Sequence, residues 1–160
     1  MAVSQGLSVV KHVTTLGTLS GSYVTGDVVG AVTEVTDVAN STGGVVILES
    51  IIALNKDTAA GTEIDIVFFD EAPVTTIGAD SAAFALADSD LSKVVGIVTV
   101  PTTDVVAGAD SSIQILKAIG LMMKCKAKTR SLFIAVIARG TEASWTDGDL
   151  QLKLGFFQEG

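Results

Sequence analysis

Short runs of apolar residues recur along the chain, and Gly, Asp, Asn, Ser or Pro bound each of them. Such runs are typical of β-strands, because strands are short and the bounding residues favour turns. Their spacing predicts an all-β fold, a β-sandwich or jelly-roll-like barrel of about eight strands, in one domain over residues 1–160. The expected strands span Leu7–Leu16, Tyr23–Val35, Val45–Leu54, Glu63–Phe69, Lys93–Val100, Ser112–Leu121, Ser131–Arg139 and Asp149–Phe157. Gly26 and Gly30 mark points at which the second of these can be split.

Two of these runs are apolar at nearly every position. Val45–Leu54 is almost continuously apolar, so we expect it in the interior of a sheet, and the loop after it predicts a hairpin with Glu63–Phe69. Nearly every residue from Leu132 to Ala138 is also apolar. This pattern predicts a strand covered on both faces, either by the second sheet and a loop or by another subunit.

The stretch TEIDIVFFDEAP, residues 62–73, contains two adjacent phenylalanines. Side chains alternate along a strand, so these two rings point to opposite faces. Phe68 continues the face that Ile64 begins, whereas Phe69 needs a cover of its own. We expect that cover from segment 74–92 or from a neighbouring subunit. The acidic pair that follows is expected in a turn before proline and not in an acidic site.

Residues 78–93, GADSAAFALADSDLSK, have a different composition. Alanine and leucine are good helix formers, and aspartate and serine are good N-terminal caps of helices. The segment predicts a short helical excursion near residues 80–92 between two strands. The candidate caps of its two helical turns are Asp80 or Ser81 and Asp88 or Ser89.

The composition limits where the apolar side chains can go. The chain is 48% apolar and only 18% charged, with a mean hydropathy of +0.56. No run approaches the roughly 18 apolar residues of a membrane-spanning helix, so we expect no membrane partner. The apolar surplus is therefore assigned to the core and to an interface with another chain. One cysteine excludes an intrachain disulfide, and the N-terminal residues lack the pattern of a signal peptide, which fits synthesis in a cytoplasm.

Charge is unevenly distributed. The net charge is −8, and residues 1–110 hold three basic and fourteen acidic residues, whereas residues 111–160 hold seven basic and four acidic residues. An acidic chain is a poor general binder of nucleic acid, so no nucleic-acid partner is expected. The asymmetry suggests an acidic solvated surface and a separate patch that can meet an acidic partner.

The segment from 117 to 130 carries the basic residues of that patch. If residues 124–130 are extended, their four cations lie along one face of the chain. This row would suit an acidic partner surface, but it would equally protect an edge strand or solvate a loop. The candidate partner-contact residues are Lys117, Lys124, Lys126, Lys128 and Arg130.

The residues do not form a recognisable catalytic or metal-binding pattern. His12 is the only histidine and Cys125 the only cysteine, and the chain has no G-x-S-x-G elbow and no phosphate-binding glycine motif. The D-x-D pairs at 88–90 and 147–149 resemble parts of calcium loops, but neither continues as an EF-hand. We therefore expect no enzyme activity, no cofactor and no catalytic or metal residue, with Cys125 as a small buried side chain.

An ordered set of segments resembles small virion proteins of tailed bacteriophages that decorate or cement the capsid. The resemblance spans most of residues 22–98, and the last third of the chain matches only in general character. It implies an all-β fold, a homotrimer on the outer surface of the phage head, the major capsid protein as partner, and no catalysis. The segments that carry it are YVTGDVVG (23–30), GGVV (43–46), IDIVFFDEAP (64–73), AFALADSD (83–90) and VGIV (95–98).

Two alternatives remain open at the level of sequence. The same composition fits a structural component of a phage tail or the base of a head fibre. A protein of another class, a jelly-roll module that binds a small ligand or carbohydrate, would need a concave pocket with aromatic groups. Trp145 and Tyr23 are the large amphipathic rings that the chain offers for it.

Overall fold

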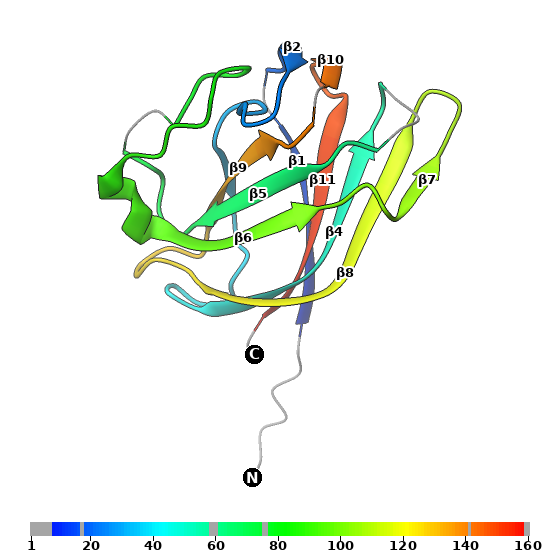
Figure 1. The fold of residues 1–160 in the computed structure, drawn as a ribbon. Helices are drawn as coiled ribbons and strands as arrows, with labels where there is room; N and C mark the ends of the chain where they lie inside the picture. Colours follow the sequence, from blue (N-terminus) through cyan, green and yellow to red (C-terminus); the bar gives the residue numbers. More distant parts are fainter. Residues whose placement is uncertain (1–7, 17, 58–60, 75–76, 141, 159–160) are drawn as a thin grey trace.

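The computed structural model describes residues 8–16, 18–57, 61–74, 77–140 and 142–158, and it is all-β, as predicted (Figure 1). Its strands are antiparallel and form two main sheets and a small two-stranded one. The five-stranded sheet has the order β1 (Ser8–Thr15), β11 (Leu150–Gln158), β4 (Val45–Asn55), β8 (Ser112–Lys124), β7 (Val105–Ala107). The four-stranded sheet has the order β3 (Thr33–Val35), β9 (Leu132–Ala138), β5 (Ile64–Phe69), β6 (Val94–Val100). The small sheet pairs β10 (Glu142–Thr146) with β2 (Ser20–Tyr23).

Two predictions about the strands are wrong. The described residues form eleven strands rather than about eight, and one reason is that short strands such as β7 lack a clear apolar alternation. Tyr23–Val35 is divided by turns at the two glycines that the sequence marked, Gly26 and Gly30, both at positive φ. The expected hairpin of β4 with β5 does not form either. Both edges of β4 are paired, with β11 and β8, and the chain after β4 crosses to the other sheet, where β5 pairs with β6 and β9.

The main core lies between the two large sheets. Their strands cross at a steep angle in Figure 1, and the side chains that point inward from each sheet are almost fully buried. Burial of this apolar area is the dominant stabilising term for a fold of this kind. The predicted shared face of β5 is confirmed. The inward side chains of the four central strands are Val46, Leu48, Ile51, Ala53, Ile64, Ile66, Phe68, Leu132, Ile134, Val136, Ala138, Leu150, Leu152, Leu154 and Phe156.

Strand β8 bends sharply at a bulge. Residues 118–120 stand opposite the single residue Glu49 of β4, and Ala118 and Gly120 have φ values of 55° and 65°. An extra residue bends a strand and increases its twist. Figure 1 shows β8 turning at this point so that its last residues run below β6, which closes one side of the sandwich.

The four-stranded sheet has a second, smaller core on its other face. Phe69 is fully buried there together with Val67 and Ala135, and Ile77 covers them from a segment outside the sheet. Phe84 and Leu86 of the same segment pack against this cluster. Residues 77–86 are called the cover segment below. The prediction that Phe69 needs its own cover is confirmed, and so is the prediction that β9 is covered on both faces by the second sheet and a loop.

A single carboxylate fixes the cover segment. Asp80 Oδ1 accepts a hydrogen bond from the Tyr23 hydroxyl and another from the Gly30 N–H, both at 2.7 Å. The turn between these two residues lies between β9 and the cover segment, because Gly26 N–H donates to the Ala138 carbonyl and Gly26 O accepts from Phe84 N–H. The segment YVTGDVVG therefore has a structural role, which is to connect the cover to the sheet.

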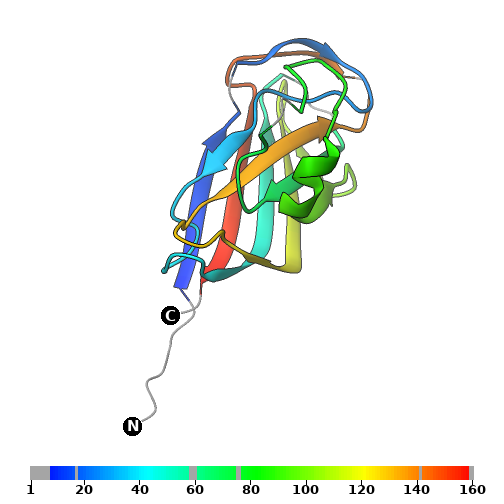
Figure 2. The same ribbon diagram turned by 90° about the vertical axis from the view of Figure 1, so that its left-hand side faces the viewer.

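The helical excursion is shorter than predicted. The only helix of the described residues is η1 (Asp88–Lys93), a 3-10 helix beyond the cover segment, visible outside the four-stranded sheet in Figure 2. The first predicted turn is absent because the N–H groups of Phe84 and Ala85 donate to Gly26 and Ile77 instead. The predicted caps are also wrong: Ala87 occupies the N-cap position, and no side chain caps the helix.

Within η1, a buried ion pair holds the turn that leads to the cover segment. The Asp90 carboxylate is fully buried, lies 2.8 Å from Lys93 Nζ and accepts the Val74 N–H at 3.0 Å. Lys93 Nζ also donates to the Ala72 carbonyl at 3.0 Å. Both charges are therefore compensated by partners inside the fold.

The substitution Phe69→Ala tests the second core. It should lower the free energy of unfolding by about 3–5 kcal/mol, because it leaves a cavity beneath the cover segment. The matched control is Val74→Ala, since Val74 is 81% exposed and should change stability by less than about 0.5 kcal/mol. Urea unfolding measures both variants, and equal midpoints for the two would contradict the assignment.

The substitution Asp90→Ala tests the buried ion pair. It leaves the Lys93 ammonium buried without its partner, so we expect a loss of about 3–5 kcal/mol in the free energy of unfolding. Asp88→Ala, in the same helix but exposed, should stay within about 0.5 kcal/mol of the parent. Thermal or urea unfolding measures the stability of both variants. If Asp90→Ala lowers the free energy of unfolding no more than Asp88→Ala does, the ion pair contributes little to stability.

Candidate interaction surface

The basic residues singled out from the sequence do not form one row. Lys117 and Lys124 lie on β8, but the chain then turns at 127–128, and Lys128 has a φ of 73°. The extended arrangement, one of those that the sequence left open, does not occur from Lys126 onward, where the residues lie in a loop. The physical reason is that the chain must cross here from β8 in one sheet to β9 in the other.

Part of the charge asymmetry is neutralised within the molecule. Lys126 Nζ lies 3.3 Å from a carboxylate oxygen of Glu71, and Arg130 pairs with Asp37. Arg139 contacts Glu63 and Asp65 at 3.2 and 3.1 Å, and the hydrogen bond to Asp65 followed by the nearby charges raises the pKa of the guanidinium. These pairs are exposed and contribute little stability each. The charges of Lys126 and Arg130 are thus partly neutralised by acidic residues of the same chain. Lys117, Lys124 and Lys128 form no ion pair with any described residue.

The D-x-D pairs are used as structural acceptors. Asp147 Oδ1 accepts the Leu19 N–H at 2.7 Å, and Asp149 Oδ2 accepts both the N–H and the hydroxyl of Thr146, at 2.7 and 2.8 Å. The bond from the Thr146 N–H is the main reason why the pKa of Asp149 is lowered. In the other pair Asp90 is bound to Lys93, as described above. No group of three or more potential metal ligands occurs among the described residues.

The side chains considered for chemistry or sugar binding are buried. Cys125 is only 2% exposed, as predicted, and burial followed by the charge of Asp70 raises the pKa of its thiol, which disfavours the reactive thiolate. Tyr23 and Trp145 are 0% and 1% exposed and contact each other, with ring centroids 5.3 Å apart. Neither ring can offer a stacking surface to a carbohydrate. The side chain of His12 lies outside the described part of the chain.

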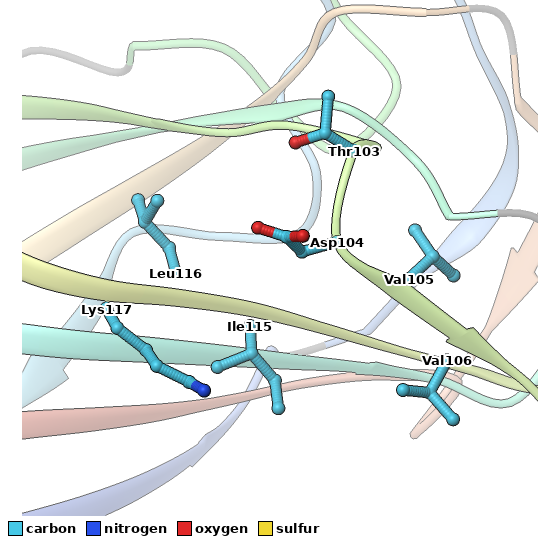
Figure 3. Close-up of a pocket in the computed structure, with 7 residues that line it drawn as sticks. All are labelled: Thr103, Asp104, Val105, Val106, Ile115, Leu116 and Lys117. Atoms are coloured by element: carbon cyan, nitrogen blue, oxygen red, sulfur yellow. The ribbon is translucent and has the colours of Figure 1, made fainter.

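A pocket of about 480 Å³ lies at the edge of the five-stranded sheet. It forms at the start of β7, where the pairing with β8 stops at Val105 and Gln114 and the loop before β7 moves away. Figure 3 shows Leu116 and Asp104 on one side of β8 and Ile115 and Lys117 on the other. The full lining is Thr103, Asp104, Val105, Val106, Ile115, Leu116 and Lys117. Its walls are therefore mainly aliphatic, with one acidic and one basic group.

The side of the five-stranded sheet that faces away from the four-stranded sheet is called the outer face. The strand register places its side chains in rows. One row joins Val106, Ile113 and Leu54, and another joins Met122, Ile47 and Phe157. Val106, Ile113 and Met122 are 63%, 38% and 66% exposed. The apolar residues of the outer face are Ile47, Ile52, Leu54, Val106, Ile113, Ile115, Met122 and Phe157.

Sequence reasoning did not find this face. The continuous apolar run of β4 predicts a strand in the interior of a sheet, and β4 is the middle strand of its sheet. However, Ile47, Ile52 and Leu54 are only partly buried, because the described structure places no layer over them. A run that is apolar on both faces indicates either an internal cover or an external partner, and no described residue supplies the internal cover here.

Comparisons with known proteins add no assignment. A scan against protein-family models finds no matching family, and a search of curated proteins finds no match. None of the helical structure in the described residues has the length and hydropathy that a membrane crossing needs. The functional argument therefore rests on the surface of the molecule itself.

The lowered pKa of Asp149 predicts a pH-dependent contribution to stability. A carboxylate whose pKa falls below its ordinary value of 3.8 on folding stabilises the fold above that pH, and the contribution disappears as the pH falls through the folded pKa. Asp149→Asn should therefore destabilise the protein at pH 7 and have less effect at pH 3. Urea midpoints at both pH values measure this, with exposed Asp110→Asn as control. The same loss at both pH values would contradict the charge-based explanation.

Proposed function

We propose that the protein is a non-enzymatic structural protein of a bacteriophage virion. In this proposal it decorates or cements the capsid: it binds the outer surface of the head through the major capsid protein and stabilises the shell as a homotrimer. It is synthesised in the cytoplasm of the bacterial host and ends on the capsid surface. The resemblance of residues 22–98 to capsid decoration proteins suggested this function, and the outer face supports it.

The observation that carries the proposal is the exposed apolar outer face. Monomeric proteins rarely leave a broad apolar patch open to solvent, and such patches mark sites of contact with other proteins. Four strands at about 4.8 Å spacing and eleven residues of β4 at about 3.4 Å per residue give a face of roughly 700 Å². A standard protein–protein interface buries about 800 Å² per partner, so one face is close to that size.

The use of the polar residues also supports a structural role. Asp80, Asp90 and Asp149 each hold a turn or a segment through hydrogen bonds, and Tyr23 and Trp145 lie inside the fold. Of these residues, Tyr23 and Asp90 belong to the segments that carry the resemblance, and both have a role in the fold. A trimer would present three outer faces, which multiplies a weak contact into a strong attachment.

Binding to phage heads tests the proposed function. The purified protein should have the mass of a trimer by light scattering and should co-sediment with heads of its phage assembled without it. Heads of an unrelated phage serve as the control, and purified tails in the same assay test the alternative of a tail component. A monodisperse monomer that binds neither heads nor tails would contradict the proposal.

The shell should also become more resistant to heat. Decorated heads should release their DNA at a higher temperature than undecorated heads, because the bound protein links neighbouring capsid subunits and favours the intact shell. Dye-accessible DNA measured during a temperature ramp gives this shift. If saturating protein leaves the temperature of DNA release unchanged, the protein does not cement the shell. Attachment to the head without cementing would still be consistent with that result.

A further inference from the structure

The five-stranded sheet is basic, although the molecule is acidic. Its five strands contain four lysines and one acidic residue, Glu49, which gives a net charge of +3. The rest of the chain contains six basic and seventeen acidic residues, a net charge of −11. Along the sequence, the net charge changes from negative to positive near residue 110. In the structure, the positive charge belongs to one layer of the sandwich, the five-stranded sheet.

Three of these lysines lie among the apolar residues of the outer face. Lys153 stands beside Ile52 in the register, and Lys117 stands beside Ser50. Lys124, the last residue of β8, is paired with Val45. All three lysines are exposed, and none forms an ion pair with a described residue. The outer face therefore combines apolar patches with unpaired positive charge.

The pocket continues this face at its edge. Val106 and Ile115 belong both to the apolar residues of the outer face and to the pocket lining, which also includes Lys117 (Figure 3). Interfaces obtain most of their binding energy from a few side chains that enter concave, well-packed places on the partner. A partner with one projecting apolar side chain beside a carboxylate would fit this arrangement, with the carboxylate near Lys117.

A second copy of the chain is a poor occupant of the outer face. Two copies that meet through identical faces would place lysines against lysines, which is unfavourable. If one copy instead placed its acidic opposite side on the outer face of the next, the contact would join opposite sides of the sandwich. A head-to-tail contact of that kind extends as a filament and does not close into a trimer.

We propose that the outer face is the attachment surface and that it docks on an apolar, acidic surface of a different protein. The identity of that protein as the shell subunit rests on the proposed function. The lysines select an acidic partner and orient it, and the apolar rows with the pocket supply most of the binding energy. Trimer contacts then use other surfaces of the molecule.

Lysine acetylation of the wild-type protein tests the attachment surface without a mutation. The protein is labelled free and bound to heads, and the modified lysines are identified by mass spectrometry. Lys117, Lys124 and Lys153 should be protected at least fivefold on the heads, whereas Lys128, exposed in the turn after β8, should react equally in both states. Protection of Lys128 with free reaction of the other three would overturn the proposal.

Matched variants test the chemistry of the partner. Lys117→Glu combined with Lys153→Glu should weaken binding to heads at least tenfold, and Lys128→Glu should leave it unchanged. Met122→Asp should also weaken binding, whereas Val74→Asp, at a more exposed position on the far side, should not. Circular dichroism and light scattering confirm that each variant is folded and has the parent's oligomeric state.

The outcomes separate the two proposals. If the wild-type protein binds heads and the outer-face variants bind equally well, the attachment surface is wrong while the proposed function stands. If an outer-face variant converts the free protein to a monomer, a second copy occupies the face, and the inference is overturned. If the wild-type protein does not bind heads at all, both proposals fail.

Discussion

The fold depends on one constraint: the four-stranded sheet is apolar on both faces and must be covered twice. β5 and β9 point alternate side chains into the main core and into the smaller core around Phe69. The five-stranded sheet covers one side. The other side requires a segment that leaves the sandwich, crosses the outside of the sheet and returns, and residues 77–86 do this. The turn after Tyr23, the carboxylate of Asp80 and the helix η1 all hold that segment in place.

Much of this arrangement could be predicted from local patterns. The double-sided burial of β9 follows from its continuous apolar run, and the need to cover Phe69 follows from two adjacent phenylalanines on an alternating strand. The pairing of strands could not be predicted in the same way. β4 and β5 are close in sequence, but the partners of β4 are β8 and β11, more than fifty residues away. Which edge a strand uses depends on the whole set of apolar faces that must meet.

The candidate surface was only partly accessible from the sequence. Lys117 and Lys124 were identified, but the alternation of charge after Lys124 suggested an extended strand where the chain turns. The ion pairs of Lys126 and Arg130 involve acidic residues far away in sequence, so their partial neutralisation was not predictable. The collection of positive charge on one layer follows from topology. β1 and β11 come from the two ends of the chain and pair with each other, and β11 and β8 lie on either side of β4 in the same sheet.

The cover segment has a consequence for partly open states of the molecule. It contributes no strand to the four-stranded sheet, so it can lift away without breaking that sheet's ladder of hydrogen bonds. Such an opening would expose Phe69 and Phe133 together while the far-ultraviolet circular dichroism stayed nearly the same. The resulting species would bind a hydrophobic dye and adhere to other chains. The tie between Asp80 and Tyr23 therefore also protects the protein against aggregation from a state that is almost native.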